Sequence, residues 1–259
     1  MTRIQQLFKT KQTRVLNIYC TAGYPRFEST LEIMKALQEN GADMVELGMP
    51  YSDPLADGPV IQESSKIALQ QGMTIKQLFG QLRNMRHPDA GIRIPVILMG
   101  YMNPVLQYGF EKFCADAAAT GVDGLILPDL PLREFETIYS PIIKKYGLDF
   151  IFLVTPETSE ERIRKIDALS TGFIYAVSSS STTGADKNFS DVERYLQRLA
   201  QMKLKNPVLV GFGIKDKETF ESACKFANGA IIGSAYINAL GKDPDERLAT
   251  EEFLKSVLE

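Results

Sequence analysis

Glu46 lies within a run of apolar residues, 44–49, that has the composition of a buried strand. Burial removes water from a carboxylate, which favours the neutral form and raises the pKa. A glutamate in that state can both donate and accept a proton near neutral pH. The run is also compatible with a glutamate at a strand edge or in a buried ion pair, so Glu46 is a candidate acid/base catalyst.

The loop after this run, residues 50–59, carries two further acids, Asp53 and Asp57, together with three prolines that stiffen its backbone. Asp57 could accept a hydrogen bond from a substrate, whereas Asp53 could face outward or cap a helix. The sequence Asp57-Gly58-Pro59 is also common in ordinary turns, and the loop alone does not separate these interpretations.

Two glycine-bearing segments, 210–214 and 232–235, follow the last two apolar runs of the chain. Small residues at such places let backbone N–H groups converge on a phosphate at a helix N-terminus. Tight turns without a ligand are the alternative. No Walker-type lysine is present, so the segments do not indicate an ATP site.

Residues 178–185 are polar, contain Gly184 and have nothing that could anchor a core. A segment of this kind at the C-terminal end of a barrel strand can act as a lid that excludes water. A flexible linker is the alternative interpretation.

Short apolar runs recur along the chain with helix-like stretches between them, as in the spacing of Leu31, Met34 and Leu37. Because the runs are nearly continuous in apolar residues, they predict strands that are covered on both faces and pair in parallel. The eight expected strands are 15–21, 44–49, 95–101, 124–128, 150–155, 173–178, 207–211 and 230–233.

Eight such units predict an α/β fold, a single (β/α)8 TIM barrel over residues 1–259 with an extra N-terminal helix within residues 1–12. A doubly wound open sheet also alternates strand and helix. Against it, no Gly-x-Gly-x-x-Gly turn follows the first strand. The longest loops also follow the second and sixth strands, at the ends where barrels place their active sites.

The composition excludes several classes of protein. A net charge of −3 gives no basic field for nucleic acid. One histidine and three scattered cysteines do not predict a metal site, a Ser-His-Asp triad or a disulfide framework. Because no apolar stretch resembles a signal peptide or a membrane span, we expect a cytoplasmic protein.

Residues 46–59 read Glu-Leu-Gly-Met-Pro-Tyr-Ser-Asp-Pro-Leu-Ala-Asp-Gly-Pro, and this run resembles the signature of the tryptophan synthase α-subunit family. Met49 and Tyr51 stand where valine and phenylalanine are usual in the family. Further similar segments cover almost the whole chain: 21–25, 98–104, 128–131, 183–185, 211–214 and 233–235. The resemblance implies a (β/α)8 barrel with an added N-terminal helix.

The resemblance also implies a reaction, the retro-aldol cleavage of indole-3-glycerol phosphate to indole and glyceraldehyde 3-phosphate. Glu46 corresponds to the family's general acid/base, and Asp57 to the carboxylate that receives the indole N–H. No metal or organic cofactor is implied for this subunit.

Further site residues follow from the same motifs. Thr183 matches the lid threonine that meets the catalytic aspartate, although Ser181-Thr182 stands where many members have Gly-Val. The positions that match the phosphate-binding backbone are Gly184, Gly213, Gly233 and Ser234. The residues that would line the indole pocket are Tyr19, Tyr101, Tyr175 and Phe212.

The family works as an αββα (α2β2) heterotetramer in L-tryptophan biosynthesis and passes indole to a β subunit that carries pyridoxal phosphate. The surface around Asp53, Asn103-Pro104 and Pro131 would face that partner. Three alternatives stay open: a stand-alone indole-3-glycerol phosphate lyase that releases free indole, a different phosphosugar barrel enzyme, and a catalytically weak subunit that activates a partner.

Overall fold

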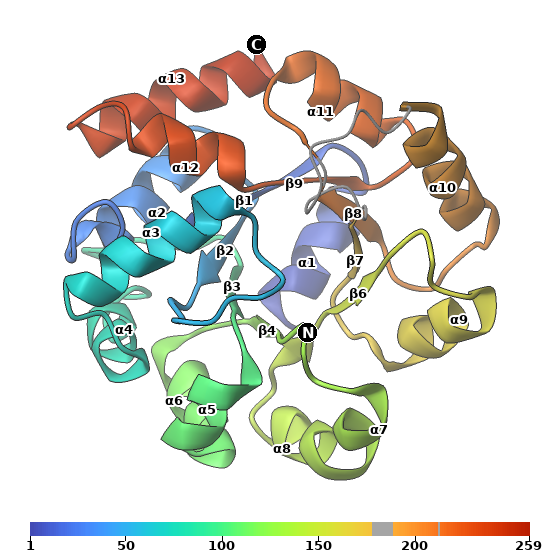
Figure 1. Ribbon diagram of the computed structural model, residues 1–259, viewed down its shortest axis with the longest axis horizontal. Coiled ribbons are helices and arrows are strands. Elements are labelled where there is room, and N and C mark those ends of the chain that lie inside the picture. Colours follow the sequence, from blue (N-terminus) through green and yellow to red (C-terminus); the bar gives the residue numbers. More distant parts are fainter. Residues whose placement is uncertain (178–188, 212) are drawn as a thin grey trace.

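The strands of the computed structural model form one parallel ring (Figure 1). The structure describes residues 1–177, 189–211 and 213–259. Around the ring the order is β5-β4-β3-β2-β1-β9-β8-β7-β6, and each pairing is parallel. The strands are β1 (Val15–Thr21), β2 (Met44–Gly48), β3 (Val96–Met99), β4 (Gly124–Ile126), β5 (Asp149–Phe150), β6 (Phe152–Val154), β7 (Ile174–Val177), β8 (Val208–Gly211) and β9 (Gly229–Ile232).

The two ends of this order, β5 and β6, are halves of one strand separated by Ile151. β5 pairs with β4, and β6 pairs with β7. The Ile151 N–H still donates to the Leu125 carbonyl at 3.0 Å, so the backbone continues across the interruption. The sheet therefore closes into an eight-stranded barrel, which confirms the predicted fold, with the run expected at 150–155 divided in two.

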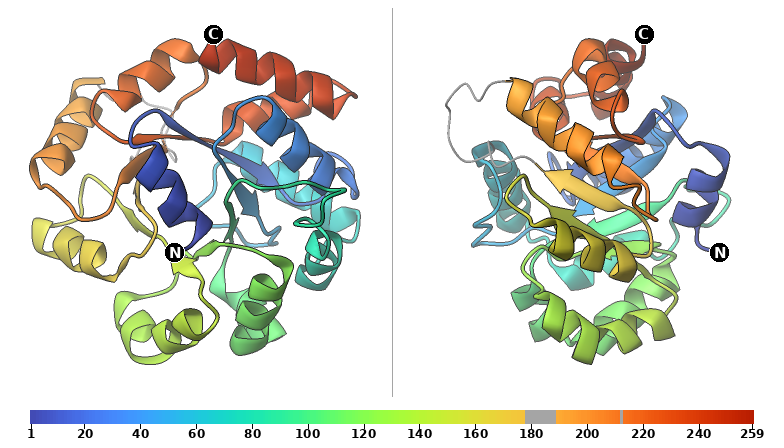
Figure 2. Two further views of the ribbon diagram at one scale, coloured as in Figure 1. Left: turned by 180° about the vertical axis from the view of Figure 1, so that it is seen from behind. Right: turned by 90° about the vertical axis from the view of Figure 1, so that its right-hand side faces the viewer.

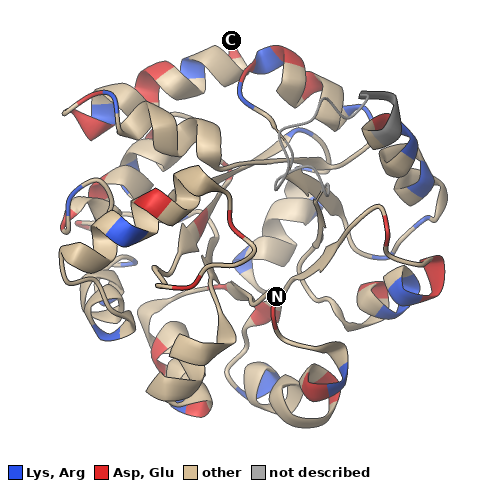
Figure 3. Ribbon diagram, in the orientation of Figure 1, with Lys and Arg blue, Asp and Glu red and all other residues tan. Residues whose placement is uncertain are grey.

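Helices alternate with the strands and surround the barrel (Figure 1). They are α1 (Arg3–Thr10), α2 (Ser29–Glu39), α3 (Pro59–Gln70), α4 (Ile75–Leu82), α5 (Met102–Tyr108), α6 (Phe110–Thr120), α7 (Leu132–Glu134), the π-helix η1 (Phe135–Tyr139), α8 (Ser140–Lys145), α9 (Glu160–Leu169), α10 (Phe189–Gln201), α11 (Lys217–Cys224), α12 (Ser234–Leu240) and α13 (Glu246–Leu258). In Figure 3 the charged positions lie mainly on these outer helices and on the loops, as expected for helices that bury one face.

The predicted N-terminal helix is α1, which lies across one end of the barrel (Figure 2, left). Thr2 caps it in a reciprocal capping box with Gln5. Its Ile4 side chain is fully buried against the apolar interior of the barrel. That interior is filled by residues in the strands or directly beside them: Val15, Met44, Ile97, Ile126, Ile151, Phe173, Leu209 and Ile231.

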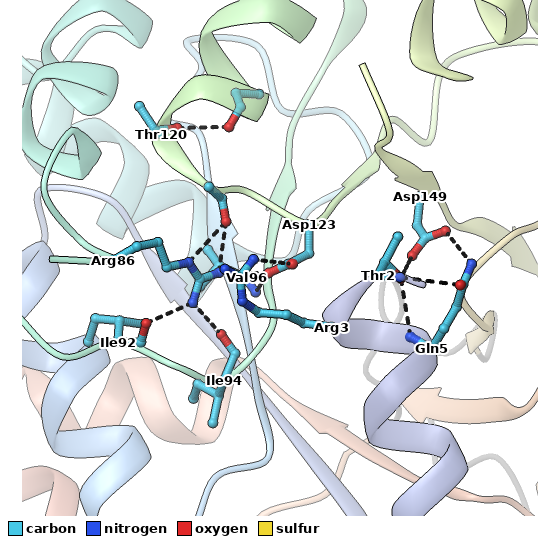
Figure 4. Close-up of polar contacts among 12 residues, drawn as sticks. Thr2, Arg3, Gln5, Arg86, Ile92, Ile94, Val96, Thr120, Asp123 and Asp149 are labelled. Atoms are coloured by element: carbon cyan, nitrogen blue, oxygen red, sulfur yellow. Dashed lines mark hydrogen bonds and ion pairs between the residues drawn. The ribbon is translucent and has the colours of Figure 1, made fainter. Parts of the chain in front are cut away.

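Polar contacts fasten the same end of the barrel (Figure 4). Asp123, which directly precedes β4, accepts hydrogen bonds from Arg3 at 2.9 Å and from Arg86 at 2.7 Å. Arg86 also donates to the carbonyl oxygens of Gly121, Ile92 and Ile94. These bonds tie α1 and the loop before β3 to the N-terminal ends of the strands, which leaves the C-terminal ends for a site.

Candidate active site

Glu46 lies in the middle of β2, a strand in which every residue is buried. Its side chain is fully buried and faces Tyr19 of β1 and Ile97 of β3 in register. Burial raises the pKa of Glu46 to about 8, and the nearby Asp57 carboxylate adds to this effect, whereas a hydrogen bond from Asn17 lowers the pKa. The acid form therefore persists near neutral pH.

The immediate partners of Glu46 separate the alternatives that its sequence left open. Asn17 Nδ2 donates to Oε2 at 3.0 Å, and Oε1 has no hydrogen-bond partner among the described residues. Glu46 is fully buried in a strand that pairs on both sides, so the strand-edge interpretation is wrong. No described cation pairs with it, so the ion-pair interpretation is wrong as well.

Asp57 lies in the loop between β2 and α3 and is partly buried. Its N–H donates to the Pro54 carbonyl at 3.0 Å, and its own carbonyl accepts from Gln62 Nε2 at 2.8 Å. The Tyr101 hydroxyl accepts from the Ala56 N–H at 3.1 Å. The loop is thus held at both the backbone and the side-chain level.

The surroundings of Asp57 also change the pKa of its carboxylate. Burial raises its pKa to about 6, and a hydrogen bond from Tyr101 opposes the rise. Asp57 therefore stays ionised at neutral pH while Glu46 stays largely neutral. Two carboxylates with different protonation states are what an acid and a charge stabiliser require.

A pocket opens beside Asp57 with an empty volume of about 280 Å³, open solvent included. Two of the aromatic residues predicted from sequence, Tyr19 and Tyr101, lie in its wall. The Tyr51 and Tyr101 rings lie 5.4 Å apart, centroid to centroid. The complete lining consists of Tyr19, Met49, Tyr51, Pro54, Asp57, Ser65, Met99, Gly100 and Tyr101.

Glycines on neighbouring strands make room for the tyrosines of this end of the barrel. A Cβ at Gly48 would overlap the Tyr19 hydroxyl, and a Cβ at Gly211 would overlap the Tyr175 ring. Tyr175, on β7, is near enough to both carboxylates for them to raise its pKa, in addition to the larger effect of burial. Tyr19 and Tyr175 therefore reach the same carboxylates from different strands.

The predicted phosphate positions lie at the ends of β8 and β9, which are neighbours in the sheet. Gly233 is the N-cap of α12, and Ser234 is the first residue of that helix. Gly213 follows β8 with a φ of +52°, a left-handed conformation that favours glycine. The structure therefore brings Gly213, Gly233 and Ser234 to the C-terminal end of the barrel, the same end as Asp57.

Three predicted site residues, Thr183, Gly184 and Phe212, lie outside the described residues, as does the expected lid over 178–185. Sequence reasoning also missed residues that the structure places at the site. Asn17 contacts Glu46, while Met49 and Gly100 line the pocket. Asn17 had a usable signal, because it is a polar residue with apolar neighbours on both sides in a predicted strand, as Glu46 is.

Membrane-spanning helices and clusters of metal-ligating side chains are both absent from the described residues. No helix in the described part of the chain is long and apolar enough to cross a membrane. No group of three or more His, Cys, Asp or Glu in the same part of the chain could hold a metal ion.

A closed parallel barrel with a buried carboxylate inside it, and a second carboxylate in the loop at the C-terminal ends of its strands, defines a (β/α)8-barrel protein with an enzyme-like site. The family model described as tryptophan synthase alpha chain matches residues 5–258. The chain belongs to the tryptophan synthase alpha chain family.

Individual relatives agree with this assignment. The chain is 50% identical over 258 residues to the tryptophan synthase alpha chain of Parabacteroides distasonis, covering 99% of each chain. It is also 50% identical to that of Flavobacterium johnsoniae, over 99% of this chain and 100% of the relative. The crystal structure of tryptophan synthase subunit alpha from Legionella pneumophila matches with a TM-score of 0.88 and 38% identity, covering 99% of this chain and 97% of the other.

Proposed function

We propose that this chain is the α subunit of a tryptophan synthase, a lyase that cleaves indole-3-glycerol phosphate to indole and glyceraldehyde 3-phosphate. The observation that carries the proposal is the state of Glu46: it is fully buried, and one of its oxygens has no partner among the described residues. Its membership of the tryptophan synthase alpha chain family supplies the substrate.

Glu46 moves both protons of the reaction. The neutral acid first gives its proton to the indole carbon that bears the side chain, forming a C–H bond and leaving a positive charge on the ring. The Glu46 carboxylate then takes the proton of the adjacent glycerol hydroxyl. The O–H electrons form the aldehyde C=O, the C–C bond breaks, and its electron pair restores the neutral indole. Glu46 ends the cycle protonated, as it began, and its raised pKa suits both steps.

Asp57 stabilises the charge that forms between these two steps. Protonation of the ring places positive charge on the indole nitrogen, and an ionised carboxylate that accepts the indole N–H lowers the energy of that intermediate. Because the loop is held by Tyr101, Pro54 and Gln62, the carboxylate needs little rearrangement when the charge appears.

The remaining site residues bind substrate in this proposal. Tyr19, Tyr101, Tyr175 and Phe212 line the indole pocket, Thr183 meets Asp57 when the lid closes, and Gly184, Gly213, Gly233 and Ser234 bind the phosphate. The cap position of Gly233 supports the last assignment, since helix N-termini attract anions. Residues 1–259 form one catalytic domain, for which no metal or organic cofactor is proposed.

The proposed partner is a β subunit that carries pyridoxal phosphate and receives indole within an α2β2 heterotetramer in the cytoplasm. Asp53, Asn103 and Pro131 are exposed, as an interface would require. Two large apolar side chains near Asp53 and Asn103 in the sequence are also exposed: Leu55 at 90% and Leu106 at 49%.

Steady-state indole formation by the purified chain, measured with and without added β subunit, tests this proposal. A large stimulation by the β subunit is expected for a synthase subunit. High turnover that the β subunit does not change would identify a stand-alone lyase instead. No indole from indole-3-glycerol phosphate under either condition would contradict the lyase activity itself.

A further inference from the structure

Asn17 is a polar residue inside the barrel for which the proposed reaction has so far no role. It lies on β1 and is fully buried. In register it faces Met44 of β2 and Ile231 of β9, both apolar. A buried amide among such neighbours costs stability unless its groups are hydrogen-bonded.

Asn17 forms one side-chain hydrogen bond with the described residues, and that bond goes to the proposed catalyst. Its Nδ2 donates to Glu46 Oε2 at 3.0 Å. Asn17 Oδ1 and Glu46 Oε1 have no partner among the described residues. This bond is strongest when Glu46 is ionised, because hydrogen bonds to charged groups are among the stronger kinds.

The direction of this bond distinguishes the two carboxyl oxygens. An amide nitrogen donates and does not accept, so Oε2 must act as an acceptor whether Glu46 is ionised or neutral. The proton of the neutral acid then belongs on Oε1. That oxygen has no described partner to compete for the proton.

We propose that Asn17 is a positioning residue that fixes Glu46 Oε2 as the accepting oxygen and reserves Oε1 as the oxygen that carries and transfers the proton. This inference rests on the proposed role of Glu46 as acid/base. Asn17 does not touch the substrate in this scheme and acts through Glu46 alone.

The charged and titratable groups around Glu46 leave this role to Asn17. Tyr19 faces it from β1 and Tyr175 lies near it on β7, whereas Cys20 lies on the opposite face of β1. Burial raises the pKa of all three groups, so they are neutral at neutral pH. Asp57 faces it from the loop after β2 and raises its pKa. The Asn17 amide opposes this rise by stabilising the carboxylate form.

Asn17→Leu, which keeps the approximate shape and removes the donor, tests the proposal in two measurements. The first is the pH titration of the Glu46 carboxyl stretch by infrared spectroscopy, isolated by subtracting the Glu46→Gln spectrum. The second is the pH profile of kcat/KM for indole formation. Both midpoints should move upward by about one pH unit, because loss of a hydrogen bond to a charged group disfavours ionisation by about that much. The value of kcat should also fall.

Asn206→Leu is the matched control. Asn206 is buried and bonds to Asp167 through its side chain, at 2.6 Å to the carbonyl and 2.9 Å to the carboxylate. Its loss should lower the unfolding temperature without moving either midpoint. If Asn17→Leu does not fold, Asn17→Ser removes the amide with less disturbance and should shift the midpoints in the same direction.

The outcomes separate this inference from the proposed function. A folded Asn17 variant whose carboxyl midpoint stays in place or moves downward would overturn the positioning role. A shifted infrared midpoint in a chain whose wild type forms no indole would support the Asn17 contact and contradict the lyase activity. If the infrared midpoint does not shift and the wild type does form indole, the result would contradict the Asn17 contact and support the lyase activity.

Discussion

Glu46 and Asp123 are both buried carboxylates of this barrel, and they differ in how their oxygens are satisfied. Asp123, 4% exposed, accepts hydrogen bonds from Arg3 and Arg86 and from the Val96 N–H at 2.9 Å (Figure 4). Glu46, 0% exposed, receives one hydrogen bond from the part of the chain that the structure describes, and it comes from Asn17. A carboxylate held by two cations serves the fold, whereas one with an unpartnered oxygen can exchange a proton.

Their positions in the barrel match this difference. Asp123 lies at the N-terminal end of the strands, where it joins α1 to the loop before β3. Glu46 lies inside β2, near the loop that carries Asp57. Barrels separate stability and chemistry in this way, with the catalytic groups toward the C-terminal ends of the strands.

Glu46→Gln should cause the largest loss of activity, because glutamine has similar shape and no proton to transfer. Indole formation should fall by about 10²–10⁴-fold, the range typical of a general acid/base. Steady-state measurement of indole release by the variant and the wild type gives this fold-loss. An activity within a few-fold of wild type in the folded variant would show that another group transfers the protons.

Glu46→Gln should also change how the stability of the fold depends on pH. Because the folded pKa of Glu46 is raised from 4.5 to about 8, the neutral side chain favours the fold at low pH. This contribution is lost progressively as the pH rises above about 4.5, and the loss is complete at about pH 8. Glutamine cannot ionise. The unfolding temperature of wild type should therefore decline relative to that of Glu46→Gln between about pH 4.5 and pH 8, and the difference should stay constant above about pH 8.

Asp57→Asn should lower kcat by about 10²–10³-fold, the effect of removing one group that stabilises a transition-state charge. The amide keeps the size of the side chain and loses its negative charge. Single-turnover measurements should place the loss in the chemical step. A change confined to KM would instead make Asp57 a binding residue.

Asp123→Leu should lower the free energy of unfolding and leave kcat nearly unchanged. It leaves Arg86 without its buried partner, and the free energy of unfolding should fall by about 3–5 kcal/mol in urea titrations. Asp123→Asn, which keeps an acceptor oxygen, should lose less. A folded Asp123→Leu protein with strongly reduced kcat and normal stability would contradict the division between the two ends of the barrel.

Tyr101→Phe should have the smallest effect, a loss of about two- to tenfold in kcat/KM, as expected for a hydrogen bond worth about 0.5–1.5 kcal/mol. Because that bond lowers the Asp57 pKa, its removal should move the acidic limb of the pH profile upward. The control is Tyr108→Phe, whose hydroxyl bonds to Asp116 instead. It should leave the limb in place.

The sequence predicted the strands of the barrel and its N-terminal helix well, because both depend on local patterns of apolar residues. It did not predict the interruption at Ile151, since the closing seam of a barrel depends on the register of strands far apart in the chain. The predicted run at 150–155 gave no sign of it.

The same limit applies to the site. Glu46 stood out as an acid in an apolar run, and the family resemblance pointed to Asp57. The contact between Asn17 and Glu46 depends on the pairing of β1 with β2, which a single strand does not encode. The space that Gly48 leaves for Tyr19 likewise becomes visible when two strands lie side by side.

Glu46 and Asp57 should hold opposite protonation states near neutral pH, and the pH profile of kcat/KM for indole formation by the wild type tests this most directly. The expected profile falls above about pH 8, where Glu46 loses its proton, and below about pH 6, where Asp57 gains one. A rate that keeps rising through pH 8, or that is lost only in the range of ordinary carboxylates, would contradict the assignment of both groups.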